Sequence, residues 1–593
     1  MNIFYWFFLI CISFSSILHS TERTFDHFVS DEMDLVLYFK STQPLGDESS
    51  EHPLITLANS PSVKEFLASL KKSNNSEDST DFYEEVEDRF GLSKAELLEL
   101  FPGQFLFGAE SLLLDSIPDS DERPAFVILA EFSGSEARLK ELMDIQFEYN
   151  ANLQKEVNPN MEHTMIESDY MGVTIHYDEA YNGVTTYIED GYALVDGVLV
   201  LASDEIQMEE AIERIRTNLD NSLAQKEPYY RSFNSDDRED FRLFLNFKNL
   251  FRPLIEFYTR GEVPVSLARF GITAESLIKA TGIDSLDTLS LGIELVPDGV
   301  KLNAALLYDK KVGFLRLLSY GDGNLPNVDS IPDDAYASSL SAFDFSEFFA
   351  SLEDMFRQAS PGFMQIYNLQ LLNLESQLGV NLKNTLLQNF GDSAYSYSLL
   401  RPGAGDNTDA QISSEVIIVE IKDTALFSQG LDAVTAVIPN LKNLAKTEDY
   451  NGQVIKTYRS PTDQSGAEAW NYALTRSKLV VTTGPVQTMK DALDHLETSP
   501  NNRLWLRPDV EALLDRVVTQ DGRVVSRTFC DLSELCASIV DELQILDATG
   551  ALPKTMNLNL LEKIKAPFVF LSQTVEQDDG IFTRALIVEK EAP

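Results

Sequence analysis

The clearest pattern along the chain is an apolar run followed by an amphipathic segment, and it occurs twice. The sequence reads "YALVDGVLVLAS" at 192–203 and "YALTRSKLVVTT" at 472–483, which lie 280 positions apart. In both copies the next segment, 206–215 or 486–496, carries apolar residues at three- and four-residue spacing. Such spacing is typical of a helix packed on a sheet. We therefore predict a strand leading into a helix at both places.

The match between the two copies continues in both directions. Asp169, Tyr170, Gly172 and Ile175 recur 280 positions later, and the offset holds without a gap as far as Gln207. Further along, Asp298-Gly299 and Asp579-Gly580 each separate two runs of alternating apolar residues. Asp-Gly in this setting is the strongest short signal for a β-hairpin. The predicted elements follow one another in the same order twice, which we interpret as an internal duplication.

The fold class follows from the kinds of connection between these elements. Runs such as 125–132 and 415–421 read as strands, and hairpin signals outnumber strand–helix–strand crossovers. We therefore predict an α+β fold of two related halves, 21–325 and 326–593. In each half a largely antiparallel sheet packs against helices on one face. The polar, proline-containing segment 325–334 marks the boundary.

A shorter motif places a polar residue where a strand turns into a helix. Asn246, Asp344 and Asp531 occupy this position in "FLNFKNLF", "AFDFSEFF" and "FCDLSELC". Asn and Asp favour the N-cap, because the side chain accepts a hydrogen bond from a free backbone N–H of the first turn. A carboxylate site is the alternative, but the Asn in one copy favours capping.

The N-terminus predicts export. Residues 3–14 are mostly apolar and no charged side chain precedes Glu22, so the apolar core has the length of a signal peptide and is short for a membrane span. We predict a signal peptide at 1–20, with an uncleaved anchor as the alternative. Cys11 lies inside the apolar run and is not expected to carry a lipid. The predicted location is extracytoplasmic, in the periplasm or secreted.

Composition narrows the range of partners. The chain has 593 residues, with 47 basic and 94 acidic side chains and a net charge of −47. A polyanion repels nucleic acid and anionic membrane surfaces, so we expect no nucleic-acid partner and no membrane insertion after signal cleavage. The hydrophobic content of 44% is that of a globular chain able to bury a core.

No motif in the sequence carries catalysis. The six histidines form no HExxH pair, and the GxSxG, P-loop and GxGxxG patterns are absent. His176 matches Lys456 in the second copy, so a catalytic histidine would be confined to one half. The segment 320–329 lacks the oxygen-ligand spacing of a calcium loop. We therefore predict no catalytic residue, no cofactor and no metal site.

Two kinds of residue leave alternatives open. Cys530 and Cys536 could form a disulfide in an oxidising compartment, or remain two buried thiols. The aromatic clusters at 228–233 and 251–258 could line a ligand groove, although their spacing fits packing in the core.

One segment resembles a known family. In "SIPDDAYASSLSAFDFSEFFASLEDMF", the turn Pro332-Asp333-Asp334 leads into a strand, and Asp344 starts a helix. This opening resembles exported bacterial proteins of the domain of unknown function 3352 type. The first half departs from it, since 30–45 keeps the strand and lacks the proline. The resemblance implies an extracytoplasmic location and no known activity, and it carries no site residue with it.

The expected function is therefore non-enzymatic binding or scaffolding in the bacterial cell envelope, with an envelope protein or a small ligand as partner. Where the copies agree, they agree at apolar, glycine and capping positions. Where they differ, as at Asp196 against Arg476 and Val198 against Lys478, a shared site would have had to agree. Two alternatives are a hydrolase of envelope polymers with paired carboxylates and a carrier of lipid or another hydrophobic ligand. We expect any site to lie where the halves differ or meet.

Overall fold

The structure is a computed structural model of the chain. It describes the following residues: 23–41, 52–65, 82–113, 124–217, 221–233, 239–259, 271–321, 325–326, 329–402, 411–437, 445–458, 470–498, 502–518, 521–548 and 567–590. The predicted signal peptide at 1–20 lies outside these residues, as do parts of the segment 320–329.

The strands of the first half of the chain are β1 to β10. They span Leu35–Phe39, Phe105–Glu110, Ala125–Glu131, Glu162–Tyr170, Val173–Tyr181, Thr186–Val195, Val198–Ala202, Phe241–Asn246, Leu286–Val296 and Gly299–Tyr308. The strands of the second half are β11 to β20. They span Ala337–Ser341, Phe390–Pro402, Gln411–Ile421, Ala445–Tyr450, Gln453–Tyr458, Trp470–Leu474, Lys478–Thr483, Arg523–Asp531, Phe568–Gln577 and Gly580–Glu589.

The α-helices lie between these strands. In the first half α2, α4, α5, α6, α7, α8, α9 and α11 span Pro53–Asn59, Phe82–Phe90, Lys94–Leu100, Glu136–Val157, Glu205–Arg216, Glu227–Ser232, Phe247–Thr259 and Ala274–Thr281. In the second half α12, α13, α14, α15, α17, α18 and α19 span Phe345–Ala359, Pro361–Leu378, Leu382–Thr385, Thr424–Val437, Val486–Glu497, Pro508–Val517 and Leu532–Ala548.

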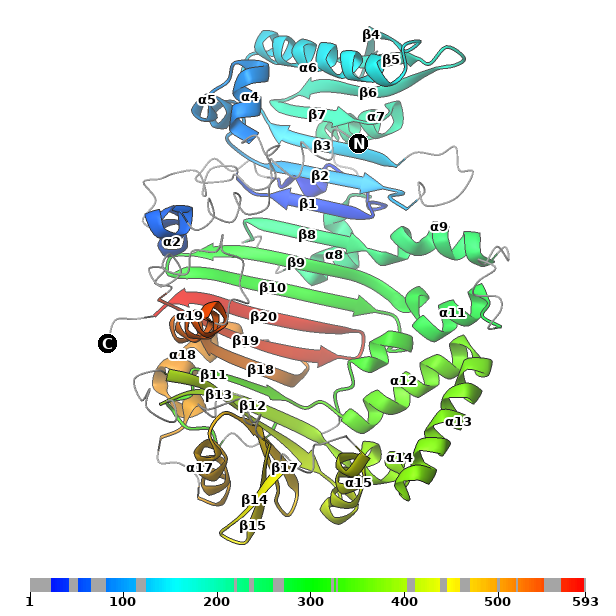
Figure 1. The fold of residues 1–593 in the computed structure, drawn as a ribbon. Coiled ribbons are helices and arrows are strands. Elements are labelled where there is room, and N and C mark those ends of the chain that lie inside the picture. The colour runs from blue at the N-terminus through cyan, green and yellow to red at the C-terminus, as the bar shows by residue number, and fades with distance from the viewer. Residues whose placement is uncertain are drawn as a thin grey trace.

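All described strands belong to one open sheet of 20 strands (Figure 1). The spatial order is β4-β5-β6-β7-β3-β2-β1-β8-β9-β10 and then β20-β19-β18-β11-β12-β13-β17-β16-β15-β14, with every neighbouring pair antiparallel. The α+β class with an antiparallel sheet is confirmed. The two halves have the same strand order when each is counted outward from the β10–β20 pair. Each strand of the second half then lies at the place of the first-half strand whose number is ten lower.

The prediction that each half has a sheet of its own is wrong. β10 pairs with β20, with Gly299 opposite Val588 and Leu307 opposite Gly580, so the two sets of ten strands share one sheet. We call this β10–β20 pair the seam. A pairing between strands so far apart in sequence leaves no local signal, because it depends on where two hairpin edges meet.

Helices cover both faces of the sheet, which corrects the expectation of one covered face. Side chains alternate between faces along β3, where Val127 and Leu129 join one core cluster and Ile128 and Ala130 join another. The first cluster includes residues of α7 and of the segment that starts at Phe25, and the second includes residues of α5 and α6.

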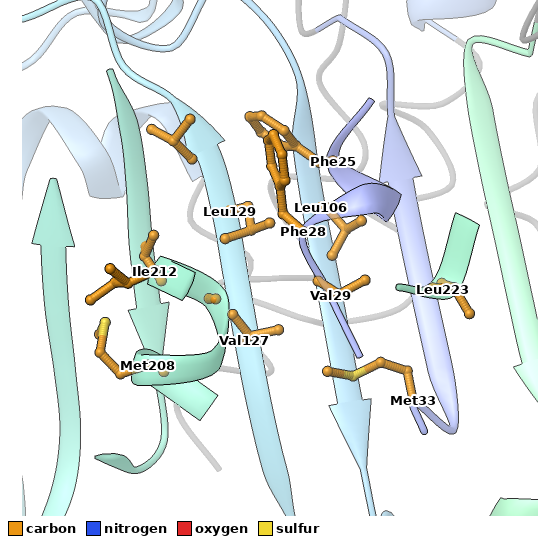
Figure 2. Packing of buried hydrophobic residues seen from close by; sticks show 14 of the residues in the cluster. Phe25, Phe28, Val29, Met33, Leu106, Val127, Leu129, Met208, Ile212 and Leu223 are labelled. Carbon is orange, nitrogen blue, oxygen red and sulfur yellow. The ribbon is translucent and has the colours of Figure 1, made fainter. Parts of the chain in front are cut away.

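The first of these clusters is shown in Figure 2. Phe28 and Val29 lie against Leu106 of β2, and Met208 and Ile212 of α7 lie beside β3. Apolar residues at three- and four-residue spacing on α7 therefore face the sheet, as the pattern at 206–215 predicts.

The "YAL" stretches are two strands each, where we predicted one. β6 and β7 are joined at Asp196 and Gly197, which have φ of 50° and 84°, and then α7 begins. The second copy also turns between two strands, from β16 to β17, but its turn residues Arg476 and Ser477 do not have a positive φ; α17 then follows. Glycine tolerates a positive φ without strain, so a two-residue turn fits within the apolar pattern.

The three capping predictions agree with the hydrogen bonds in the structure. Asn246 Oδ1 accepts from the Asn249 backbone N–H at 3.3 Å, and Asp344 Oδ1 accepts from the Glu347 N–H at 3.0 Å. Asp531 Oδ1 accepts from the Ser533 N–H at 3.1 Å. These side chains therefore start helices α9, α12 and α19.

Candidate functional site

The helix α13 differs from the rest of this acidic chain in composition. Ser360 caps it by accepting a hydrogen bond from the Phe363 N–H at 3.2 Å, and Gly379 ends it in the left-handed region at φ 70°. Over its 18 residues, "PGFMQIYNLQLLNLESQL", Glu375 is the single charged side chain. The whole chain has 24% charged residues, so a helix of this length would ordinarily carry about four of them.

Most of the large apolar side chains of α13 are exposed. Met364 is buried and anchors the helix, whereas six others have exposed fractions between 37% and 62%. They are Phe363, Ile366, Tyr367, Leu369, Leu372 and Leu374. Phe356 of α12 is also exposed and its ring centroid lies 5.7 Å from that of Phe363. We call Phe356 and these six side chains the α13 surface.

Figure 1 shows α13 at the outer edge of the molecule, beyond α12. The charged residues near it are engaged with one another, since Arg316 pairs with Glu347 and Asp354, and Lys383 pairs with Glu353. Several large apolar side chains exposed together on one helix are characteristic of a contact surface. None of the seven side chains of the α13 surface is charged, so they can bury apolar area against a partner.

The seam is bridged by two matching ion pairs. Arg231 of α8 donates hydrogen bonds from Nη1 and Nη2 to the two carboxylate oxygens of Asp579 in the β19–β20 turn. Arg516 of α18 donates to both oxygens of Asp298 in the β9–β10 turn, at 2.7 and 2.9 Å. Each half thus holds the hairpin turn of the other. These hydrogen bonds are the first cause of the lowered pKa of Asp298 and of Asp579.

We expect the double variant Arg231→Ala, Arg516→Ala to lose about 1–2 kcal/mol of unfolding free energy, since the bidentate pairs are partly exposed. Arg138→Ala breaks an exposed pair with Glu141 away from the seam and should cost less than about 0.5 kcal/mol. Urea unfolding at low and high salt measures both. A loss that 1 M salt leaves unchanged would contradict the ion-pair explanation, because screening weakens exposed pairs.

The two halves differ most clearly at one cross-strand pair. In the first half Asp178 of β5 lies opposite Asp190 of β6, and in the second Tyr458 of β15 lies opposite Trp470 of β16. The Tyr458 and Trp470 rings stack at 4.3 Å between centroids. One half thus carries a carboxylate pair where the other carries an aromatic stack.

His163 contacts Asp178, one of the two carboxylates of this pair. His163 Nδ1 lies 2.9 Å from each carboxylate oxygen of Asp178, and both side chains are almost fully buried. Desolvation, together with the charges of Asp178 and Glu189, raises the pKa of Asp190 to about 7. A pair with a raised pKa is what the hydrolase alternative requires. Asp178 and its partner His163 are buried, so Asp178 cannot contact a polymer substrate.

Both predicted cysteines carry free thiols in the structure. Cys530 lies on β18, one residue before its end, and is buried, whereas Cys536 lies on α19 and is half-buried. Burial raises the pKa of Cys530 to about 11 and also raises the pKa of Cys536, so neither is a reactive thiolate at neutral pH. Their pairing in an oxidising compartment stays a prediction.

His176 and Lys456, which the alignment matches, both lie on aromatic rings. The His176 ring stacks on Tyr192 at 4.7 Å, and Lys456 Nζ lies 5.5 Å from the Tyr472 ring centroid. His176 is partly buried. His176 Nδ1 lies 3.5 Å from Glu167 Oε1, and Lys456 Nζ donates to Asp432 Oδ1 at 2.6 Å.

Two of the three aromatic residues at 228–233 pack into the core, whereas Tyr230 is 55% exposed. Tyr229 is buried, and its ring centroid lies 5.0 Å from those of Phe233 and Phe244. From the cluster at 251–258, Phe251 stacks on Phe247 at 5.5 Å. The described residues hold no cluster of three His, Cys, Asp or Glu side chains that could bind a metal ion. None of the described helices combines the length and hydropathy needed to cross a membrane.

Comparisons with known proteins give a distant likeness to solved structures. No family model and no curated protein matches the chain, so the resemblance to the domain of unknown function 3352 type gains no support. Two crystal forms of TP0453, a Treponema protein, match with 9% identity and TM-scores of 0.20 and 0.21. They cover 49% and 45% of this chain and 81% and 80% of TP0453. At such scores the likeness carries no argument about function.

Proposed function

We propose that this chain is a non-enzymatic binding or scaffolding protein that docks a partner protein through the α13 surface. The observation that supports the proposal is the set of six exposed apolar side chains on a helix with one charged residue. Burying a large apolar side chain contributes about 1.5–3 kcal/mol, so a few well-packed anchors suffice for a stable complex.

The charge of the chain favours one class of partner. With a net charge of −47, two copies repel each other at long range, and so do this chain and an anionic lipid surface. The partner that complements both features has an apolar groove for α13, rimmed by lysine and arginine. Complementary charges would speed the encounter, and the apolar contact would set the lifetime of the complex.

The predicted export signal supports an extracytoplasmic site for this binding, in the cell envelope. We further infer that the halves arose by duplication, from the shared strand order and the matching Arg231–Asp579 and Arg516–Asp298 pairs. On this account α13 is a specialisation of one half of a duplicated scaffold. We do not propose the hydrolase, because Asp178 and His163 are buried and out of reach of a polymer substrate. No observation favours lipid carriage.

The test is a triple substitution on the exposed side of α13. Ile366→Ser, Leu369→Ser and Leu372→Ser together should convert a complex purified from the native host into free monomer, as measured by size exclusion with light scattering. A control triple variant at Val157, Val184 and Val518 removes exposed apolar side chains elsewhere. It should leave the complex intact. A wild-type chain that is monomeric in its host, or loss of the complex in both variants, would contradict the proposal.

A further inference from the structure

A row of polar side chains crosses the seam on one face of the sheet. Residues directly opposite one another in antiparallel strands point to the same face. Reading across β8, β9, β10, β20, β19 and β18, the residues in register are Arg242, Gly292, Asn303, Arg584, Gln573 and Arg527. The seam divides this row into two matching sets of three.

The two end arginines of the row occupy matching positions but have different surroundings. Arg242 is buried between Asp26 and Glu239, with Nη1 and Nη2 at 2.9 and 3.2 Å from their carboxylates. Arg527 is partly buried, and its Nε donates to Gln573 Oε1 at 3.0 Å. Among the described residues it has no carboxylate partner. In a chain with twice as many acidic as basic residues, this arginine retains an uncompensated charge.

The middle of the row contains a second group without a partner. Asn303 is 7% exposed, and neither its amide nitrogen nor its amide oxygen has a hydrogen-bond partner among the described residues. Its neighbour Arg584 donates to the Val518 carbonyl at 3.1 Å. Unsatisfied buried polar groups are costly, so native proteins keep few of them without a ligand or a functional reason.

We propose that Arg527 and Arg584, with Gln573 orienting Arg527 and with Asn303 beside them, bind a small oxyanion carrying a carboxylate or phosphate group. Arg527 and Arg584 lie on the strands on either side of Gln573, at about 5 Å per strand, so their two guanidinium groups can approach one anion. Gln573 between them is 1% exposed and orients Arg527 through the Nε hydrogen bond. The planar fork of arginine matches either oxyanion with two parallel hydrogen bonds. The Asn303 amide, one strand further, would contact an uncharged polar part of the same ligand. The site is separate from the α13 surface.

Titration of the full-length chain with sodium phosphate and with sodium succinate tests the site, with sodium chloride at matched ionic strength as reference. We expect calorimetric binding of at least one anion, weakened at least tenfold by Arg527→Met and several-fold by Asn303→Leu. Arg138→Met, on the exposed face of α6, should bind as the wild type does. Binding of phosphate alone or of succinate alone would support the site and identify the ligand group. No binding above chloride, or wild-type binding by Arg527→Met, would overturn it.

A second readout separates ligand binding from a structural role of Arg527. Removing an uncompensated cation should leave the melting temperature unchanged or raise it when no anion is present. A fall of several degrees in anion-free buffer would show that Arg527 stabilises the fold and would overturn the proposal.

Discussion

Replacing Arg242 by methionine is expected to destabilise the protein by about 3–5 kcal/mol. The guanidinium is 2% exposed and contacts Asp26 and Glu239, whose side chains are 3% and 1% exposed. It also lies 5.5 and 5.3 Å from the ring centroids of Tyr38 and Phe233. Methionine would remove the cation that both buried carboxylates contact, and their desolvation makes the loss large.

Equilibrium urea unfolding of Arg242→Met measures this loss, and Arg138→Met serves as the exposed control. The triple variant Arg242→Met, Asp26→Leu, Glu239→Met should recover much of the lost stability, because an apolar set of similar volume can replace a buried ion pair. If Arg242→Met lost no more than Arg138→Met, the assignment of the cluster as a buried, mutually dependent set would be wrong.

The second large effect is a fall in stability between about pH 4 and pH 7. Asp190 has a pKa of about 7 in the folded protein against an ordinary 3.8, so the folded state binds the extra proton in this window. Stability therefore decreases as pH rises through 7. A shift of about three units corresponds to at most about 4 kcal/mol, at 1.36 kcal/mol per unit.

Asp190→Asn keeps the shape and removes the titration, so its unfolding free energy should depend less on pH than that of the wild type. Glu110 also has its pKa raised to about 7 by desolvation and the charges of Glu210 and Glu32. The variant Asp190→Asn, Glu110→Gln should therefore flatten the profile further. Asp196→Asn, in an exposed turn, is the matched control. Equal pH profiles for Asp190→Asn and the wild type would contradict the raised pKa.

Local features of the fold could be predicted from the sequence because their causes are local. The hairpin turns at Asp298 and Asp579 depend on two residues, and the caps at Asn246, Asp344 and Asp531 depend on one side chain and the next turn. The union of the halves into one sheet could not be predicted, because it arises from contact between strands about 280 residues apart.

The candidate sites were harder to predict. The near absence of charge over 361–378 can be read in the sequence, but it resembles a buried helix, and only the fold leaves Leu369 and Leu372 exposed. The set of Asn303, Gln573 and Arg527 depends on strand register across the seam, which no single segment encodes. The expectation that a site lies where the halves meet or differ fits both proposals, and both remain to be tested.

The most direct test of the central claim is site-specific photo-crosslinking in the native host, with a photoreactive phenylalanine at Leu369 or Leu372. Val157 and Val184, which are at least as exposed, serve as control positions. The account predicts one protein crosslinked from both α13 positions and from neither control, with a basic rim around an apolar groove. Crosslinks to lipid, to a second copy of this chain, or equally from the control positions would contradict it.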